Sequence, residues 1–264
     1  MKLKSKLLII AGSDSSGGAG IQADIKTATS LGVYAMTAIT AITAQNTTGV
    51  KSIVPVPPKE IFNQISFSVQ DIKPNSVKIG MLHNVGVIKE VIKAIKKYKL
   101  KNIVIDPVMV AKGGHRLISN SSINYLRKKL LPYALLVTPN IPEAETLIKK
   151  RIQTLEDVIK AGKEILKFGP KFVLIKGGHT NKSFIEDVLI SKNNIKIFKN
   201  KKIKTKNTHG TGCTLSSAIA SFISKNYNMN ESCRRSIQYV HKAILLNPKF
   251  GRGHGPINHM ALLN

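Results

Sequence analysis

The sequence predicts an α/β fold, a single-domain three-layer α/β/α sandwich around a mainly parallel sheet that spans residues 1–264. Short, continuously apolar runs alternate with longer amphipathic segments, as expected for buried strands joined by helices. The chain has 264 residues, of which 42% are hydrophobic, so it can form one large core. No segment reads as a linker, a repeat or a low-complexity block, which favours one domain.

The expected strands are runs rich in Ile, Val and Leu. They lie at 7–11, 35–43, 77–79, 103–105, 135–138, 172–175, 187–190 and 195–198. The expected helices are segments in which apolar residues recur every three to four positions. They lie near 20–31, 59–70, 85–98, 120–130, 142–149, 155–168, 212–224 and 231–246. Because such sheets bind ligands at the carboxyl ends of their strands, the residues that follow each strand are the candidates for function.

The composition is strongly basic, with a formal net charge of +27, and this excess raises the question of a nucleic-acid partner. Only 6 of the 41 basic residues are Arg, the aromatic content is 5%, and the lysines are spread along the chain. Base readout favours Arg, and base stacking needs aromatic side chains. An A/T-rich codon bias, which also enriches Asn and Ile, explains the charge better. We therefore expect no nucleic-acid partner.

The amino-terminal segment combines lysines with an apolar run, as a signal peptide does. That run is shorter than the apolar region of a signal peptide, and it fits a buried first strand better. No apolar run reaches the roughly 18 residues that span a bilayer. The two cysteines, Cys213 and Cys233, are too few for a disulfide framework. We expect a cytoplasmic protein without a membrane partner.

The first three strand exits suggest a pocket for a flat ligand. Residues 11–20 contain four glycines, including Gly12, which permit close backbone approach to a ligand, although an ordinary flexible loop is the alternative. Asp24 follows in the next helix, where a carboxylate also suits the helix dipole. Gln45 offers a donor and an acceptor side by side for a heterocycle edge, or it caps its loop. Met81 is either core filler or one wall of a pocket for a planar ligand.

The next three exits carry charged and polar side chains. Asp106 ends a buried strand, and Asn140 and Glu143 follow the next one. Oxygen ligands from neighbouring exits suit a partly hydrated Mg²⁺ that carries nucleotide phosphates. The alternative for Asn140 and Glu143 is a helix capping box. Lys176 follows another apolar strand, and a cation there suits a phosphoryl group in transfer.

The last loop reads Asn-Thr-His-Gly-Thr-Gly-Cys-Thr over residues 207–214 and leads into a helix. Gly210 and Gly212 let backbone N–H groups converge on an anion at the helix start. Cys213 lies where the pKa of a thiol is typically lowered, although a small buried residue that packs the helix entry is the alternative. An anion hole, a lysine, carboxylates for a divalent ion and a polar pocket together fit phosphoryl transfer.

Seven blocks in order, at 11–24, 44–49, 78–82, 106–109, 138–144, 176–179 and 208–214, resemble a known family. They are similar to the hydroxymethylpyrimidine/phosphomethylpyrimidine kinases of thiamine biosynthesis, in the ribokinase-like superfamily. The resemblance implies a ribokinase-like fold and two phosphorylations with ATP and Mg²⁺. The first converts 4-amino-5-hydroxymethyl-2-methylpyrimidine to its monophosphate, and the second converts that to the diphosphate. It also implies a homodimer.

The resemblance implies roles for individual residues. Those implied to bind the pyrimidine are Gly12, Asp24, Gln45, Met81 and Val108. Those implied to bind Mg-ATP are Asn140, Glu143, Lys176 and Thr208, with Asp106 and Glu143 at the metal. Those implied in catalysis are Lys176, Gly210, Gly212 and Cys213, with Cys213 in the position of a proton acceptor.

Two points qualify the resemblance. Ser15 stands where the family usually has Pro, and we expect this to loosen the first loop. A related kinase that phosphorylates the hydroxymethyl group of pyridoxal would have similar loops. Cys213 and the block at 44–46 favour the pyrimidine over pyridoxal.

Overall fold

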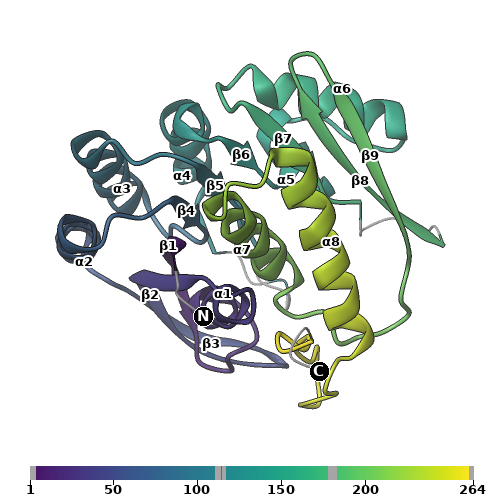
Figure 1. The fold of residues 1–264 in the computed structure, drawn as a ribbon, viewed down its shortest axis with the longest axis horizontal. Coiled ribbons are helices and arrows are strands. Elements are labelled where there is room, and N and C mark those ends of the chain that lie inside the picture. The colour runs from purple at the N-terminus through teal and green to yellow at the C-terminus, as the bar shows by residue number, and fades with distance from the viewer. Residues whose placement is uncertain (1–3, 111–113, 115–116, 178–182, 262–264) are drawn as a thin grey trace.

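A central sheet with helices on both faces forms the molecule (Figure 1). The computed structural model describes residues 4–110, 114, 117–177 and 183–261. Within these residues one nine-stranded sheet has the order β3-β2-β1-β4-β5-β6-β7-β8-β9. The strands are β1 (Lys6–Asp14), β2 (Tyr34–Asn46), β3 (Gly49–Pro55), β4 (Ser76–Ile79), β5 (Ile103–Ile105), β6 (Leu136–Val137), β7 (Phe172–Ile175), β8 (Phe184–Ser191) and β9 (Ile195–Lys201).

The six strands from β2 to β7 in this order pair in parallel, and antiparallel pairing is confined to the two edges. This confirms the mainly parallel sheet predicted from the sequence. Strand β3 was not predicted. It is an exposed edge strand that ends at Pro55, so it lacks the continuous apolar run that marks a buried strand.

The helices cover both faces of the sheet. They are α1 (Gly20–Ser30), α2 (Pro58–Asp71), α3 (Val85–Tyr98), α4 (Asn120–Tyr125), α5 (Ile141–Ile148), α6 (Leu155–Leu166), α7 (Thr211–Ser224) and α8 (Met229–Leu245). Helix α4 is shorter than the segment predicted at 120–130, because a π-helical turn at Leu126–Leu130 and a 3₁₀ turn at Leu131–Tyr133 continue it.

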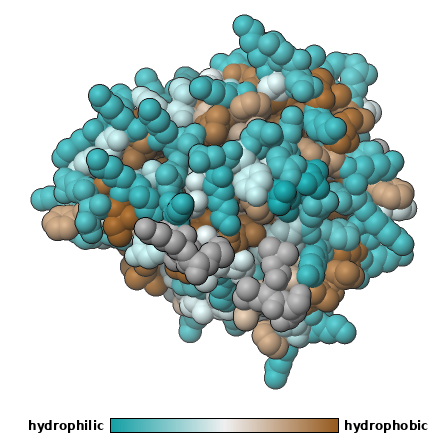
Figure 2. All heavy atoms as spheres, viewed as in Figure 1, coloured by the Kyte–Doolittle hydropathy of each residue, from teal (hydrophilic) through white to brown (hydrophobic). Residues whose placement is uncertain are grey.

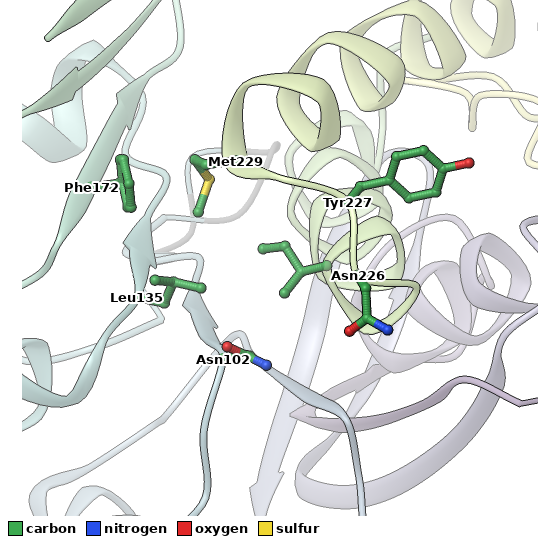
Figure 3. Close-up of a pocket in the computed structure, with 7 residues that line it drawn as sticks. Asn102, Leu135, Phe172, Asn226, Tyr227 and Met229 are labelled. Carbon is green, nitrogen blue, oxygen red and sulfur yellow. The ribbon is translucent and has the colours of Figure 1, made fainter.

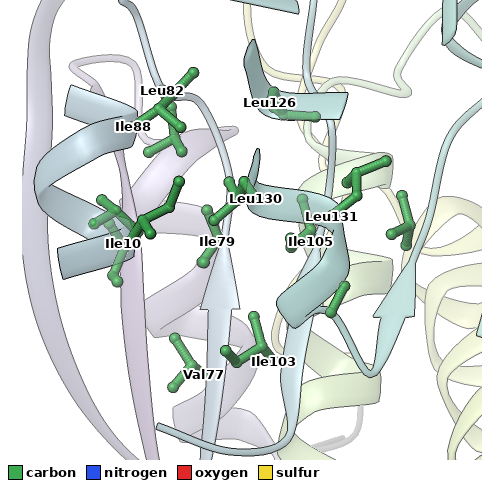
Figure 4. Close-up of a cluster of buried hydrophobic side chains, with 14 of the residues drawn as sticks. Ile10, Val77, Ile79, Leu82, Ile88, Ile103, Ile105, Leu126, Leu130 and Leu131 are labelled. Carbon is green, nitrogen blue, oxygen red and sulfur yellow. The ribbon is translucent and has the colours of Figure 1, made fainter. Parts of the chain in front are cut away.

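Alternate residues of each strand face opposite layers. In β1, Leu8 and Ile10 pack with helices α2 to α6, whereas Leu7 and Ile9 pack with α1, α7 and α8. Figure 4 shows the first of these cores, in which Ile10 lies near the side chains of β4 and β5. Two apolar cores on the two faces of one sheet make the predicted α/β/α sandwich.

Hydrophilic residues dominate the one face of the molecule that Figure 2 shows. On the face shown in Figure 2 they are spread over the whole view, with smaller apolar areas between them. Among the described residues, no helix has the length and apolar character needed to cross a membrane.

Candidate active site

The candidate residues lie at the carboxyl ends of six neighbouring parallel strands, and the sheet order divides them into two groups. The β2–β1–β4 group comprises Gln45, Gly12 and Met81. The β5–β6–β7 group comprises Asp106, Asn140, Glu143 and Lys176. Helix α7 packs against β1, β4 and β5, so it lies where the two groups meet.

An apolar wall forms the β4 side of the first group. Met81 packs with Ala41 and Leu117, and Val108 packs against this cluster. A Cβ added to Gly12 would lie 2.3 Å from Met81 Cε, so only glycine leaves room for the methionine here. The structure therefore brings Gly12, Met81 and Val108 together.

Gln45 lies at the end of β2 and is half-buried. Its side-chain nitrogen is 3.4 Å from His209 Nε2 in the last loop. The Ser15 hydroxyl donates to the backbone oxygen of Gln45 at 2.9 Å and accepts from its backbone N–H at 2.8 Å. Ser15 therefore fastens the first loop to β2, which contradicts the expectation that it loosens the loop.

Lys176 lies between two carboxylates in the second group. Its Nζ is 2.9 Å from Asp106 Oδ1 and 3.8 Å from Glu143 Oε2, and Thr138 donates to the same Asp106 oxygen at 3.3 Å. Burial alone would lower the pKa of Lys176, but Asp106 and Glu143 raise it above its ordinary value. The cluster therefore holds a permanent cation.

Glu143 has a second structural role. Its Oε2 accepts from Asn140 N at 2.8 Å, and Asn140 Oδ1 accepts from Glu143 N at 2.9 Å. This is the capping box that the spacing suggested, and it opens helix α5. Burial raises the pKa of Glu143 to about 7, against the opposing effect of Lys176. The cap holds the carboxylate at the edge of the charged cluster.

Gly210 caps the N-terminus of α7 in a conformation that glycine favours, with φ of +82°. An added Cβ would lie 1.8 Å from the Gly18 carbonyl oxygen, so the first and last loops are in contact here. The Thr208 carbonyl oxygen accepts from the Thr211 hydroxyl at 2.7 Å and closes the turn.

Gly212 faces the charged cluster. A Cβ added there would lie 3.3 Å from Lys176 Nζ and 3.7 Å from Asp106 Oδ2. Free backbone N–H groups at a helix N-terminus attract anions, and here they stand beside a lysine. The arrangement can bind a phosphoryl group. Of the block at 176–179, Gly178 and His179 lie outside the described residues.

Cys213 is the third residue of α7 and is partly exposed. Burial raises the pKa of its thiol to about 12, although Lys78 acts to lower it. The expected lowering at a helix start is therefore wrong for the free protein. Desolvation outweighs the helix dipole, so the thiol is protonated at neutral pH.

Asp24 does not lie in the open part of the site. Its side chain is fully buried, Lys78 Nζ is 2.6 Å from its Oδ2, and the Ser217 hydroxyl donates to its Oδ1 at 2.6 Å. Both carboxylate oxygens are therefore engaged within the protein. The structure corrects the expectation that Asp24 hydrogen-bonds a ligand, and we do not carry that role forward.

Sequence reasoning missed two residues that join the first and last loops. Asp14 Oδ2 is 2.7 Å from His209 Nε2, and its Oδ1 accepts from the backbone N–H and hydroxyl of Ser16. Burial acts against the charge, but the bonds from His209 and Ser16 lower the pKa of Asp14 to about 2. The sequence could have drawn attention to Asp14, because it is a carboxylate inside a Gly- and Ser-rich loop. No sequence pattern predicts that it pairs with His209, which lies 195 residues away.

A separate cavity of about 320 Å³ lies at the other end of the sheet. Figure 3 shows Asn102, Leu135 and Phe172 around it, and these residues precede or begin β5, β6 and β7. This cavity is therefore at the amino ends of the strands, away from the candidate site.

Two carboxylates converge on the ammonium group of Lys176, so the cluster stabilises a positive charge between Asp106 and Glu143. Among the described residues, no three His, Cys, Asp or Glu side chains are grouped closely enough to hold a metal ion alone. Mg²⁺ is usually held by one or two carboxylates together with phosphates and water. The donor set therefore fits Mg²⁺ that arrives with a nucleotide.

A phosphomethylpyrimidine kinase family model matches residues 14–258. The chain belongs to this family. It is 42% identical over 257 residues to the hydroxymethylpyrimidine/phosphomethylpyrimidine kinase of Bacillus subtilis, with 97% of this chain and 95% of that one covered. It is 43% identical to the thiamine biosynthesis bifunctional protein ThiED of Geobacter sulfurreducens, and there it spans 52% of the relative's length.

Solved structures agree with the sequence comparison. A phosphomethylpyrimidine kinase from Clostridium difficile superposes with a TM-score of 0.82 at 45% identity, over 91% of this chain and 100% of that one. A Bacillus subtilis pyridoxal kinase in an ADP complex superposes with a TM-score of 0.92 at 36% identity, over 98% of both chains. The family resemblance, the fold and the ATP-dependent kinase activity expected from the loops are thereby confirmed.

Proposed function

We propose that this chain transfers phosphoryl groups from ATP to 4-amino-5-hydroxymethyl-2-methylpyrimidine and then to its monophosphate, as a step of thiamine diphosphate synthesis. The observation that carries the proposal is the position of Lys176, between two carboxylates and beside the glycine-capped N-terminus of α7. Phosphoryl transfer needs positioned reactants and neutralised charge, and this cluster provides both.

The first group of residues suits the pyrimidine. The amide of Gln45 presents a donor and an acceptor toward the exocyclic amine and ring nitrogen of an aminopyrimidine. Met81 and Val108 form the apolar wall against which a flat ring packs. The hydroxymethyl group would then face α7, between the ring site and the charged cluster.

The second group suits the nucleotide. Lys176 would contact the transferred phosphate, the N–H groups after Gly210 and Gly212 would bind its oxygens, and Thr208 would border the nucleotide. Asn140 keeps Glu143 in place through the capping box. Asp106 and Glu143 would hold Mg²⁺, which supplies further neutralisation of phosphate charge when it is bound. The thiol of Cys213 is protonated in the free protein. It must therefore lose this proton before it can accept the proton of the substrate hydroxyl group.

The proposal is tested by measuring ADP release with three substrates: hydroxymethylpyrimidine, its monophosphate and pyridoxal. We expect turnover of both pyrimidines, with a higher kcat/KM than for pyridoxal. A chain that turns over pyridoxal alone would refute the pyrimidine assignment, and the pyridoxal kinase neighbour at 36% identity makes that comparison necessary. Replacing Cys213 by Asp and by Ala tests the proton acceptor, since equal activity of the two variants would rule out that role.

We also propose that the chain acts as one kinase domain over residues 1–264, as a homodimer in the cytoplasm. Ile42 and Val54 lie opposite each other on β2 and the edge strand β3, and they are 55% and 60% exposed. Exposed apolar side chains on an edge hairpin favour burial against a second copy. Replacing Ile42 by Lys should shift sedimentation toward the monomer, and an unchanged dimer would place the interface elsewhere.

A further inference from the structure

Among the residues that the structure describes, the largest fully buried side chain is that of a lysine, Lys78. It is the third of the four residues of strand β4, and it pairs in register with Ile9 on β1 and Val104 on β5. Both of these neighbours belong to the apolar core that faces α1, α7 and α8. A buried charge among these apolar side chains is unfavourable unless an opposite charge and hydrogen bonds compensate it, so its presence calls for a functional reason.

Lys78 is paired through a chain of short contacts. Its Nζ is 2.6 Å from Asp24 Oδ2, and the Ser217 hydroxyl donates to Asp24 Oδ1 at 2.6 Å. All three side chains are fully buried. The three residues come from β4, α1 and α7, so this Lys78–Asp24–Ser217 triad joins the sheet to the two helices above it.

The triad lies one helical turn beyond the reaction centre. Asp24 is four residues after Gly20, the first residue of α1, and Ser217 is four residues after Cys213 on α7. Helices α1 and α7 pack against each other. The Asp24–Ser217 hydrogen bond therefore joins the two helices one turn after Gly20 and Cys213.

The ammonium group reaches toward the site. A Cβ added to Gly80, which follows β4, would lie 2.9 Å from Lys78 Nζ. The cation is therefore at the carboxyl end of the strand, on the sheet side of α7. Stability alone does not explain it, because well-packed apolar residues in place of a buried ion pair are often neutral or stabilising.

We propose that the Lys78–Asp24–Ser217 triad is a positioning device, which holds the N-termini of α1 and α7 in register around Cys213 and keeps a buried cation between the sheet and α7. The inference deepens the proposed kinase function, on which it rests. Four charged groups act on the thiol: Lys78 from β4, Asp24 from α1, Asp106 after β5 and Lys176 after β7. Of these charges, Lys78 has the largest effect on the thiol.

The positioning role is tested with a matched pair of serine variants. Ser217→Ala removes the hydrogen bond between the helices. Ser221→Ala removes an equally buried hydroxyl one turn later on α7, which donates only to the carbonyl oxygen of Ser217 in its own helix. We expect Ser217→Ala to lower kcat for hydroxymethylpyrimidine by about tenfold to a hundredfold with little change in KM, since small misplacement of reacting groups has effects of this size. Ser221→Ala should keep the wild-type kcat, and equal loss in both variants would overturn the positioning role.

The cation is tested by the rate at which iodoacetamide alkylates Cys213 at pH 8.5, followed by mass spectrometry without nucleotide. Cys233 is fully buried, so the modified position is readily distinguished. Lys78→Met should slow the reaction by about tenfold, equivalent to a rise of one unit in the thiol pKa. Asp24→Asn should accelerate it, because the variant removes the opposing charge. A merely structural role predicts faster alkylation in both variants, since both would loosen the helices.

The single variants leave one buried charge unpaired and can therefore fail to fold. The double variant Lys78→Met/Asp24→Leu keeps the test possible, because it replaces the whole ion pair by apolar groups of similar size. We expect it to unfold near the wild-type Tm while kcat remains depressed. Wild-type kcat in a folded double variant would overturn the proposal. Absence of pyrimidine turnover in the wild-type chain would instead refute the kinase function, and the alkylation rates would still decide whether Lys78 acts on the thiol.

Discussion

Gly212→Ala gives the sharpest test of the proposed phosphoryl site. The added methyl would lie 3.3 Å from Lys176 Nζ and 3.7 Å from Asp106 Oδ2, in the space between the helix start and the charged cluster. Gly212 has no left-handed backbone conformation, so alanine adds no backbone strain. We expect kcat to fall by about a hundredfold, the size of effect seen when one donor to a developing anion is lost.

The same variant should not lose stability. Alanine is favoured over glycine inside a helix by about 0.8–1.0 kcal/mol, so the Tm should stay level or rise slightly. Gly86→Ala is the matched control. Gly86 is also the second residue of its helix, α3, and an added Cβ would lie 3.2 Å from Asn84 Oδ1 and from Pro58 Cγ, neither of which belongs to the charged cluster. ADP release and thermal unfolding are measured for both variants. A Gly212→Ala variant with kcat within about twofold of wild type would refute a phosphoryl group at this position.

Three further predictions concern residues around this centre. Lys176→Ala should lower kcat by at least about a hundredfold in the ADP-release assay, because the phosphate loses its cation, and near-normal turnover would exclude that role. Gln45→Ala should mainly raise KM for hydroxymethylpyrimidine, and a fall in kcat at unchanged KM would show that the amide acts in the transition state instead. Asp14 has a pKa of about 2 in the fold against 3.8 ordinarily, so its charged form stabilises the protein by about 2 kcal/mol above pH 4. That stability is lost as the pH falls from 4 toward 2. Asp14→Asn should lower the Tm at pH 7 and flatten the dependence on pH in this window, and an unchanged acid unfolding curve would show that the His209 contact contributes nothing.

The parallel centre of the fold could be predicted because it depends on local pattern. Buried strands such as β5 and β7 are uniformly apolar, and helices such as α3 and α6 carry one apolar face. The edge strand β3 has no such pattern, since most of its residues are exposed. Its position depends on pairing with β2. The sequence of one strand does not show which strand it pairs with.

The site divides in the same way. Lys176 and Asp106 could be predicted because polar residues directly after buried strands have no packing role. Asp24, on helix α1, was misassigned because its partner Lys78 comes from a strand 54 residues further along the chain. The signal for Lys78 was nevertheless present, since a lysine in the middle of a short buried strand must find a counter-charge.

Contacts between the loop after β1 and the turn before α7 link the proposed pyrimidine site to the proposed phosphate site. The Asp14–His209 pair and the contact between Gly18 and Gly210 both join the loop after β1 to the turn that begins α7. His209 also lies 3.4 Å from the amide of Gln45, which faces the proposed pyrimidine position. A displacement of the α7 start therefore changes the environment of Gln45, and a ligand held by Gln45 acts on the α7 start through His209. Recognition of the ring and placement of the phosphate consequently depend on the same contacts, so variants of Asp14 should alter KM for the pyrimidine and kcat together.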